Sequence, residues 1–312
     1  MTLEQPDCDS SKDLAVSVVV PSFNSARTVE ACVNALLDQD LPDHDYEILL
    51  VDNNSTDDSA ERIARFEKRV RLLAEPSQGA YAARNRGLRH ARGQFIAFTD
   101  PDCLPRQDWL SSGLAALRSG AEVVIGRNNP PPGSRAIDRL MLYEHHKDRY
   151  TLSAGDRRLY YGHTNNMAAT REALRRCGPF VERPRGSDTI FVRRVVEALG
   201  TDAVQYEPGM RVTHLEVNRL MVYLRKVFIY GRSRRLYRHI METRALSTRE
   251  RVQVFRAVRK SEDLTTSASV ELLSLLLLGV VSWNIGSLLG LAGDSDEHPA
   301  SHGSSRSAAS GE

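Results

Sequence analysis

Apolar and polar positions alternate along the first half of the chain in blocks that predict strands followed by helices. Short apolar runs, typical of strands buried in a parallel sheet, occupy residues 15–20, 47–51, 70–74, 95–99 and 122–126. Apolar residues at helical spacing fill the intervals, at residues 29–37, 59–68, 79–88 and 109–117. This alternation predicts an α/β domain with a mostly parallel central sheet flanked by helices.

The apolar run 95–99 ends on two carboxylates, Asp100 and Asp102, separated by one proline. In open parallel sheets, ligands bind at the carboxyl ends of the strands. Asp52 follows the second strand, so three carboxylates are expected at one edge, where they repel unless a cation compensates. Oxygen donors of this kind suit a divalent cation bound to phosphates. The alternative is a plain turn, since Asp-Pro-Asp is also good turn chemistry, and the position of Asp52 favours the ligand site.

The second half of the chain has a less regular pattern. It predicts a helix at 135–150, a loop entering a short strand near residue 165, and a helix that begins close to Asp188. Two short strands are expected at 204–206 and 212–214. Taken alone, Asp188 fits an acid stabilised by the helix dipole, and His214 fits a structural histidine.

The composition fits one large domain or one domain with an appendage, because the chain has 312 residues, 41% hydrophobic and 26% charged. Its net charge of +2 excludes a polyanion-binding molecule as a whole, although residues 211–260 hold 14 Lys and Arg against 3 Asp and Glu. Four scattered cysteines indicate free thiols in a reducing compartment. Cys103 lies beside two carboxylates that disfavour a thiolate, so we expect it to serve packing.

The carboxyl-terminal part contains 22 residues, 272–293, without a formal charge. That length can cross a bilayer, which takes about 20 residues. A helix packed on the domain and a helix lying in the membrane interface are the alternatives. Cations on the amino side of this segment would keep the main domain in the cytoplasm. The expected organisation is a flexible amino terminus without a signal peptide, a main domain, a basic helix with the apolar membrane-associated segment, and a disordered tail, at 1–13, 14–240, 241–293 and 294–312.

Four motifs identify a family when they are taken together. They read VVVPSFN, ILLVDNNSTD, GAYAARNRGL and TDPD, at residues 18–24, 48–57, 79–88 and 99–102. In this order and spacing, across about residues 14–216, the chain resembles the family 2 inverting glycosyltransferases. The resemblance implies the GT-A nucleotide-sugar-binding fold, followed here by a carboxyl-terminal apolar helical segment.

The resemblance also implies a donor pocket. Its nucleotide-sugar-binding residues would be Pro21, Phe23, Asn24, Asp52, Arg84 and Asp100. In this assignment Asp52 accepts a hydrogen bond from the base, and Asp100 approaches the ribose. Arg84 helps to form the nucleotide pocket and is supported by Asn85.

For the metal, the resemblance implies that Asp102 coordinates Mn²⁺ or Mg²⁺ on the diphosphate, with His214 as a further contact. For the acceptor, it implies that Asn165 and Asn166 lie in the acceptor-side loop. Asp188 aligns with the general base.

Three positions leave alternatives open. Family members usually carry an acidic pair at the base, and here Ser187 precedes Asp188. Arg232 and Arg235 lie in the basic zone, where a phosphate contact, a contact with anionic lipid and a solvated basic face are all compatible with the sequence.

The expected function is metal-dependent transfer of a sugar, with a UDP-sugar as the expected donor, to a glycan or lipid-linked acceptor at the cytoplasmic face of the membrane. A polyprenyl-phosphate sugar synthase and a non-catalytic scaffold of the same fold are the alternatives. A nucleotidyltransferase is disfavoured, because Pro21-Ser22-Phe23-Asn24 is not a glycine-rich phosphate loop. No nucleic-acid partner is expected, since the basic zone lacks an aromatic stacking platform.

Overall fold

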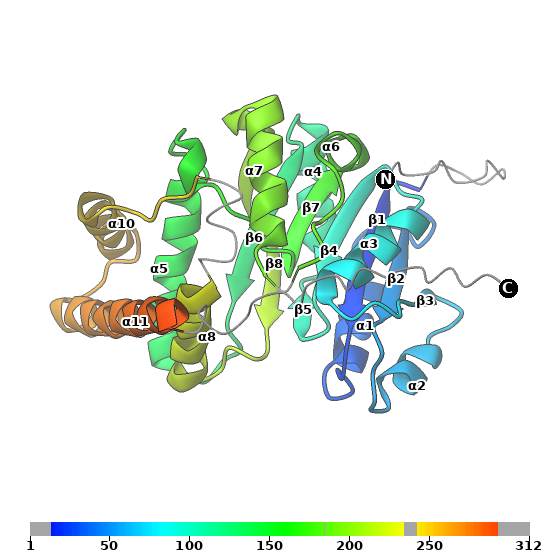
Figure 1. Cartoon of the computed structure of the whole chain (residues 1–312), viewed down its shortest axis with the longest axis horizontal. Helices are drawn as coiled ribbons and strands as arrows, with labels where there is room; N and C mark the ends of the chain where they lie inside the picture. The colour runs from blue at the N-terminus through cyan, green and yellow to red at the C-terminus, as the bar shows by residue number, and fades with distance from the viewer. Residues whose placement is uncertain (1–13, 184, 234–241, 293–312) are drawn as a thin grey trace, which may run out of the picture.

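The structure is a computed structural model and describes residues 14–183, 185–233 and 242–292. Within these residues, eight strands form one sheet in the order β3-β2-β1-β4-β7-β6-β8-β5 (Figure 1). The strands are β1 Val16–Ser22, β2 Tyr46–Asp52, β3 Val70–Ala74, β4 Phe95–Thr99, β5 Cys103–Pro105, β6 Val123–Asn129, β7 Asn166–Thr170 and β8 Val204–His214. Four of the seven pairs between these strands are parallel, and the pairs β4–β7, β6–β7 and β5–β8 are antiparallel.

Helices cover both faces of the sheet, as the alternating pattern predicts. In the described residues they are α1 Val29–Leu37, α2 Ser59–Ala64, α3 Ala80–His90, α4 Trp109–Arg118, α5 Arg135–Thr151, α6 Arg171–Cys177, α7 Ser187–Leu199, α8 Leu220–Ser233, α10 Thr248–Ser261 and α11 Thr266–Ala292. Short 3-10 turns lie at Arg157–Leu159 and Thr201–Ala203.

Strand β1 is apolar along most of its length because both of its faces are buried. Val18 and Val20 point into a core shared with α1 and α4, whereas Val19 points into a second core shared with α3 and α7. Alternate side chains of a strand face opposite sides of the sheet, so a strand covered on both faces is apolar throughout. All seven residues of β1 are buried.

Two strands differ from the sequence prediction. The expected pieces 204–206 and 212–214 form one strand, β8, which continues through Pro208 and Gly209. A register shift opposite Gly126 and Arg127 of β6 accommodates this middle part. The short strand β5 was not predicted, and it pairs with the end of β8 so that Cys103 lies opposite His214.

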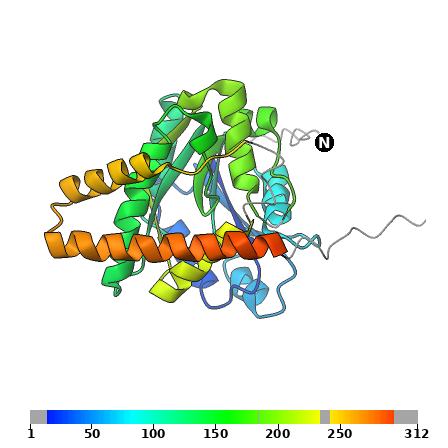
Figure 2. The ribbon, with the colours of Figure 1, turned by 60° about the vertical axis from the view of Figure 1, so that its left-hand side comes forward.

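The carboxyl-terminal helices form a separate layer at the outer side of α5 (Figure 2). The first half of α5 packs against α11 through Ile137, Leu140 and Leu275. The second half packs against α10 through Tyr143 and Val258. The predicted domain boundary at residues 240–241 lies outside the described residues, as does Arg235.

Candidate active site

The carboxylates lie at the carboxyl edge of the parallel half of the sheet, where the apolar runs predict them. Asp52 is the last residue of β2, and Asp100 directly follows β4. The backbone N–H of Ser55 donates to Oδ2 of Asp52 at 3.3 Å. Oδ1 of Asp52 is buried and has no hydrogen-bond partner among the described residues. A buried acceptor without a donor is costly, so this atom is suited to accept a hydrogen bond from a ligand.

Arg84 of α3 and Asp100 are brought together, as the donor-pocket hypothesis requires. Their side chains form an ion pair, in which the Arg84 side chain is only 4% exposed. The Arg84 guanidinium also lies 5.3 Å from the centre of the Tyr81 ring. A buried guanidinium needs such partners, so Asp100 and Tyr81 fix its position at this edge of the sheet.

The loop after β1 is held by Asn24, which has a positive φ of 48°. Its backbone N–H donates to Oγ of Ser55 at 3.0 Å, and its Oδ1 accepts from the N–H of Thr56 at 2.8 Å. Asn24 therefore ties the first loop to the second. Phe23 is 50% exposed beside it and is available for stacking, whereas Pro21 is buried at the end of β1.

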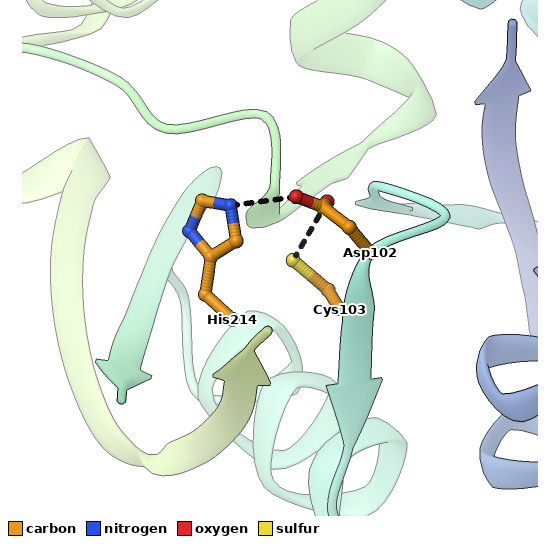
Figure 3. Close-up of side chains that lie close together, drawn as sticks. All are labelled: Asp102, Cys103 and His214. Atoms are coloured by element: carbon orange, nitrogen blue, oxygen red, sulfur yellow. Dashed lines mark hydrogen bonds and ion pairs between the residues drawn. The ribbon is translucent and has the colours of Figure 1, made fainter. Parts of the chain in front are cut away.

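Asp102 and His214 form the centre of a candidate metal site (Figure 3). Oδ2 of Asp102 lies 2.9 Å from Nε2 of His214. Two ligands in adjacent octahedral positions, at about 2.1 Å from an ion, are roughly 3 Å apart, so this spacing suits a shared cation. Burial acts to raise the pKa of Asp102, but His214 and Lys226 outweigh it and hold that pKa below its usual value. The carboxylate is thus ionised and ready to bind.

Cys103 lies in the same cluster as Asp102 and His214, but its thiol is not suited to bind the metal. Its Sγ lies 3.8 Å from Oδ1 of Asp102 and is fully buried. Burial, followed by the charges of Asp100 and Asp102, raises the pKa of the thiol well above its usual value. A protonated thiol is a poor ligand for Mn²⁺ or Mg²⁺, so the donor set is a carboxylate and an imidazole.

Lys226 is a site residue that sequence reasoning missed. Its Nζ lies 3.2 Å from Nε2 of His214 and 3.0 Å from Oε2 of Glu216. The sequence pointed instead to Arg232 on the same helix, whose side chain is exposed. At 100° per residue, the two positions lie about 120° apart around the helix, so they face different surroundings. A helical projection of α8 places Lys226 and Arg232 on different faces.

The side chains of Asn165 and Asn166, the pair predicted on the acceptor side, have different surroundings in the structure. Nδ2 of Asn165 lies 3.4 Å from Nδ1 of His214 and 3.2 Å from Oδ1 of Asn128. Asn165 therefore orients the imidazole through the ring nitrogen that does not face Asp102. Asn166 is fully buried, and its Oδ1 accepts from Nε1 of Trp109 at 2.8 Å. Its Nδ2 donates to the carbonyl of Met210 at 3.1 Å. Asn166 is thus the first residue of β7, where its amide joins neighbouring elements, and the acceptor-side role of the pair stays a prediction.

Asp188 lies in the first turn of α7, where the backbone N–H of Thr189 donates to its Oδ1 at 2.8 Å. Burial, followed by the charge of Asp188, raises the pKa of the Tyr81 phenol well above its usual value. Tyr81 therefore lies close to both Arg84 and Asp188. Ser187 is fully buried, and its Oγ has no hydrogen-bond partner among the described residues. A carboxylate at that position would be buried as well, which accounts for an uncharged residue there.

The segment Tyr161-Gly162-His163, which the sequence analysis did not single out as part of the site, lies against Asp188. A Cβ atom at Gly162 would be 2.8 Å from the carbonyl oxygen of Asp188, so only glycine allows this approach. On either side of Gly162, the Tyr161 hydroxyl donates to Asp148, and Nε2 of His163 lies 3.9 Å from Oδ1 of Asp148. Burial acts to lower the pKa of His163, but Asp148 and then Asp188 raise it above its usual value. In the sequence, the glycine between Tyr161 and His163 was the pattern that could have indicated this close contact.

Comparisons with known proteins agree with this arrangement. Residues 17–178 match the model of glycosyl transferase family 2, which is more than half of the 312-residue chain. The chain belongs to this family. It is 31% identical over 192 residues to "Glycosyltransferase AglE" of Haloferax volcanii, covering 59% of this chain and 62% of AglE.

A shorter match involves the Escherichia coli protein "UDP-Glc:alpha-D-GlcNAc-diphosphoundecaprenol beta-1,3-glucosyltransferase WfgD". It is 35% identical over 104 residues, covering 33% of this chain and 39% of WfgD. The chain thus spans less than two thirds of the length of either relative.

Solved structures show the same fold. The mannosyltransferase PcManGT from Pyrobaculum calidifontis, in complex with GDP-Man and Mn²⁺, has a TM-score of 0.61 at 18% identity, covering 94% of this chain and 92% of that one. S. aureus TarS 1–349 in complex with UDP has a TM-score of 0.54 at 16% identity, covering 90% and 92%. The predicted GT-A fold is confirmed.

Proposed function

We propose that the protein is an inverting, metal-dependent glycosyltransferase that moves a sugar from a nucleotide-sugar to a glycan or lipid-linked acceptor at the cytoplasmic face of the membrane. The observation that carries this proposal is the pair Asp102–His214, with 2.9 Å between Oδ2 and Nε2, at the edge that also bears Asp52 and Asp100. Ligands of open α/β sheets bind at this edge.

The donor would be held by this chain's own groups before any chemistry. Oδ1 of Asp52 offers the base an acceptor, and the exposed ring of Phe23 offers it a stacking surface. Asp102 and His214 would hold Mn²⁺ or Mg²⁺, which supplies Lewis-acid stabilisation of the leaving diphosphate when bound. Lys226 adds a positive charge at the same place.

Asp188 would act as the general base. The positive end of the α7 dipole stabilises its carboxylate at the start of the helix. Asp188 accepts the proton of the acceptor hydroxyl, whose oxygen forms the new bond to the anomeric carbon. The bond from that carbon to the diphosphate oxygen breaks, and its electron pair leaves with the nucleoside diphosphate. One displacement from the opposite face inverts the anomeric configuration.

The comparisons guide the choice of substrates to test. The name of WfgD specifies a UDP-sugar and a diphosphoundecaprenol-linked acceptor, and the TarS structure contains UDP. The PcManGT structure contains GDP-Man and Mn²⁺. We therefore expect a UDP-sugar or GDP-sugar donor and a lipid-linked acceptor, with UDP-sugars tested first.

The decisive test combines product analysis with one substitution. The protein is incubated with a panel of nucleotide-sugars and a membrane extract, and products are identified by mass spectrometry. In Asp188→Asn, turnover should fall about 10²–10⁴-fold, as expected for loss of a general base. Thermal-shift binding of the nucleoside diphosphate should be unchanged. The exposed Asp202→Asn serves as the matched control and should keep full activity.

Three results would contradict this proposal. Undiminished turnover of Asp188→Asn would remove Asp188 from the mechanism. Failure of every nucleoside diphosphate to shift the melting temperature, with or without Mn²⁺, would favour a non-catalytic scaffold. A polyprenyl-phosphate sugar as the product would assign the synthase alternative.

A further inference from the structure

The outer face of α11 is mainly apolar, with Ser274 and Asn284 as exposed polar residues on it. Among the described residues, α11 is the helix long and apolar enough to cross a membrane, over Thr266–Leu289. Its exposed large side chains, each at least 39% exposed, are Val270, Leu273, Leu277, Leu278, Val280, Val281, Ile285, Leu288 and Leu289. A contiguous apolar surface of this length marks an interaction site on a protein that otherwise has a charged exterior.

The inner face of α11 is attached to the domain near both ends. At one end Glu271 forms ion pairs with Arg139 at 2.7 Å and with Arg135 at 3.3 Å. Leu272 and Leu275 are buried beside them. At the other end, Oγ of Ser282 donates to the carbonyl of Leu224 on α8 at 2.8 Å.

Two glycines bring the backbones of α8 and α11 into direct contact. A Cβ atom at Gly231 of α8 would collide with the carbonyl oxygen of Trp283. A Cβ atom at Gly286 of α11 would collide with the carbonyl oxygen of Phe228. Small residues at such crossings allow the closest helix packing, so the attachment of α11 is specific to these positions.

The attachment determines how α11 can meet a membrane. Its contacts extend from Ala268, which is buried, to Gly286, a length of about 27 Å at 1.5 Å per residue. The hydrocarbon core of a bilayer is about 30 Å thick. If α11 crossed it in this arrangement, α5 and α8 would enter the core with Arg139, Arg225 and Lys226. Charged side chains are strongly disfavoured there.

Charge on the neighbouring helix indicates which surface α11 meets. Helix α10 lies on the same side of the molecule as α11 (Figures 1 and 2). It buries Val254 and Val258 against α5 and α11. Its exposed cations are Arg249, Arg251, Arg256, Arg259 and Lys260. Its one acid, Glu250, is paired with Arg244. Cations beside an apolar strip fit an anionic membrane surface.

We propose that α11 lies in the plane of an anionic membrane surface, with its exposed apolar face among the lipid chains, the cations of α10 at the headgroups and the domain attached, and that it does not cross the bilayer. This inference does not depend on the transfer reaction. A protein that binds nucleoside diphosphate but not vesicles would contradict it, and the membrane location with it, while leaving the proposed sugar transfer and its residues intact.

The first experiment measures binding of the full chain to vesicles by flotation. Binding should require phosphatidylglycerol in phosphatidylcholine vesicles and should fall at least tenfold in Leu277→Asp/Leu288→Asp, whose positions are 58% and 63% exposed. Because both side chains face outward, the fold should persist, and an unchanged nucleotide thermal shift verifies this. Leu72→Asp, at a 39% exposed position on the edge strand β3, is the matched control and should bind like the wild type.

The second experiment distinguishes a helix α11 that lies in the plane of the membrane surface from one that crosses the bilayer. Single cysteines replace Leu273, Val281 and Leu288 in a Cys8→Ser background, since the other cysteines are buried. A fluorescent label at all three should report the same shallow depth by lipid quenching. A middle label deeper than the two outer ones would show a span and overturn the proposal. Absence of vesicle binding together with a dimer in light scattering would assign the apolar face to a second copy of the chain, which also overturns it.

Discussion

The two ends of the sheet build their parts of the active site in different ways. In the parallel half, the candidate site residues lie on or beside the loops that directly follow β1, β2 and β4, and neighbouring loops are tied by contacts such as that between Asn24 and Thr56. In the antiparallel half, Asp102 meets His214 across 112 residues because β5 pairs with β8. The first half depends on local motifs, whereas the second depends on strand register, and the predictions below test this difference.

The largest effect is expected from Asp102→Ala, which removes the residue that joins the two halves. Metal-dependent binding of the nucleoside diphosphate should be lost, and turnover should fall about 1,000-fold, since a metal ion is worth several kcal/mol to such a reaction. Calorimetry with and without Mn²⁺ measures the binding. Asp43→Ala, at an exposed ion pair with Arg69, should behave like the wild type. Equal nucleotide affinity of both variants would show that Asp102 does not hold the metal.

A smaller effect is expected from Gly162→Ala, which changes the antiparallel half alone. The added Cβ would be 2.8 Å from the Asp188 carbonyl oxygen and should displace the base. Misplacement by about 1 Å costs about 100-fold in turnover, with the nucleotide affinity unchanged. Gly279→Ala is the control, because a Cβ at Gly279 has nothing within 4 Å. A parallel loss of nucleotide affinity would mean that the two halves are not independent.

Lys226→Met should have a weaker effect, because it leaves Asp102 and His214 in place. Removing one charged hydrogen-bonding group beside the diphosphate should weaken its binding about tenfold. Arg225→Met, at the neighbouring exposed position of α8, is the control. Affinities from calorimetry at constant salt measure the difference. Similar losses in both variants would indicate a general electrostatic effect rather than a contact at the site.

The smallest effect concerns the attachment of the carboxyl-terminal layer and its dependence on pH. Arg244 pairs with Asp156 and Glu250 and, with Ser247, lowers the pKa of Glu250 from 4.5 to about 2. A carboxyl group whose pKa is lower in the folded than in the unfolded protein stabilises the fold. This stabilisation is complete at a pH above the unfolded-state pKa, and it is lost as the pH falls through the folded-state pKa. Glu250→Gln should therefore lower the melting temperature at pH 7, and the difference should disappear between about pH 4.5 and 2. A constant difference across this range would exclude the charge as its cause.

The parallel half could be predicted because its information is local. The run 95–99 has the bounds of β4, and Asp52 and Asp100 lie at the edge that strand direction implies. The family resemblance predicts Asp102 and His214 as metal contacts, and the pairing of β5 with β8 brings these two side chains together.

The remaining features depend on contacts between distant segments. Pro208 and Gly209 predict a break in β8, but pairing with β6 overrides this local preference. Asn166 could not be told from Asn165 by residue type, because only the start of β7 at Asn166 places its side chain in the core. The contact of Gly162 with Asp188 likewise requires the three-dimensional arrangement of the loop and α7.

Helix α8 has a consequence for how this protein should be assayed. Lys226 contacts His214, and Gly231, five residues later, contacts the backbone of α11. The two contacts lie about 7.5 Å apart along one helix, so we expect a shift of α11 to displace Lys226 from His214. Detergent, a truncation before residue 266 or a bulky tag near α11 is then expected to change the measured nucleotide affinity. Kinetic constants should be determined on the full chain bound to vesicles.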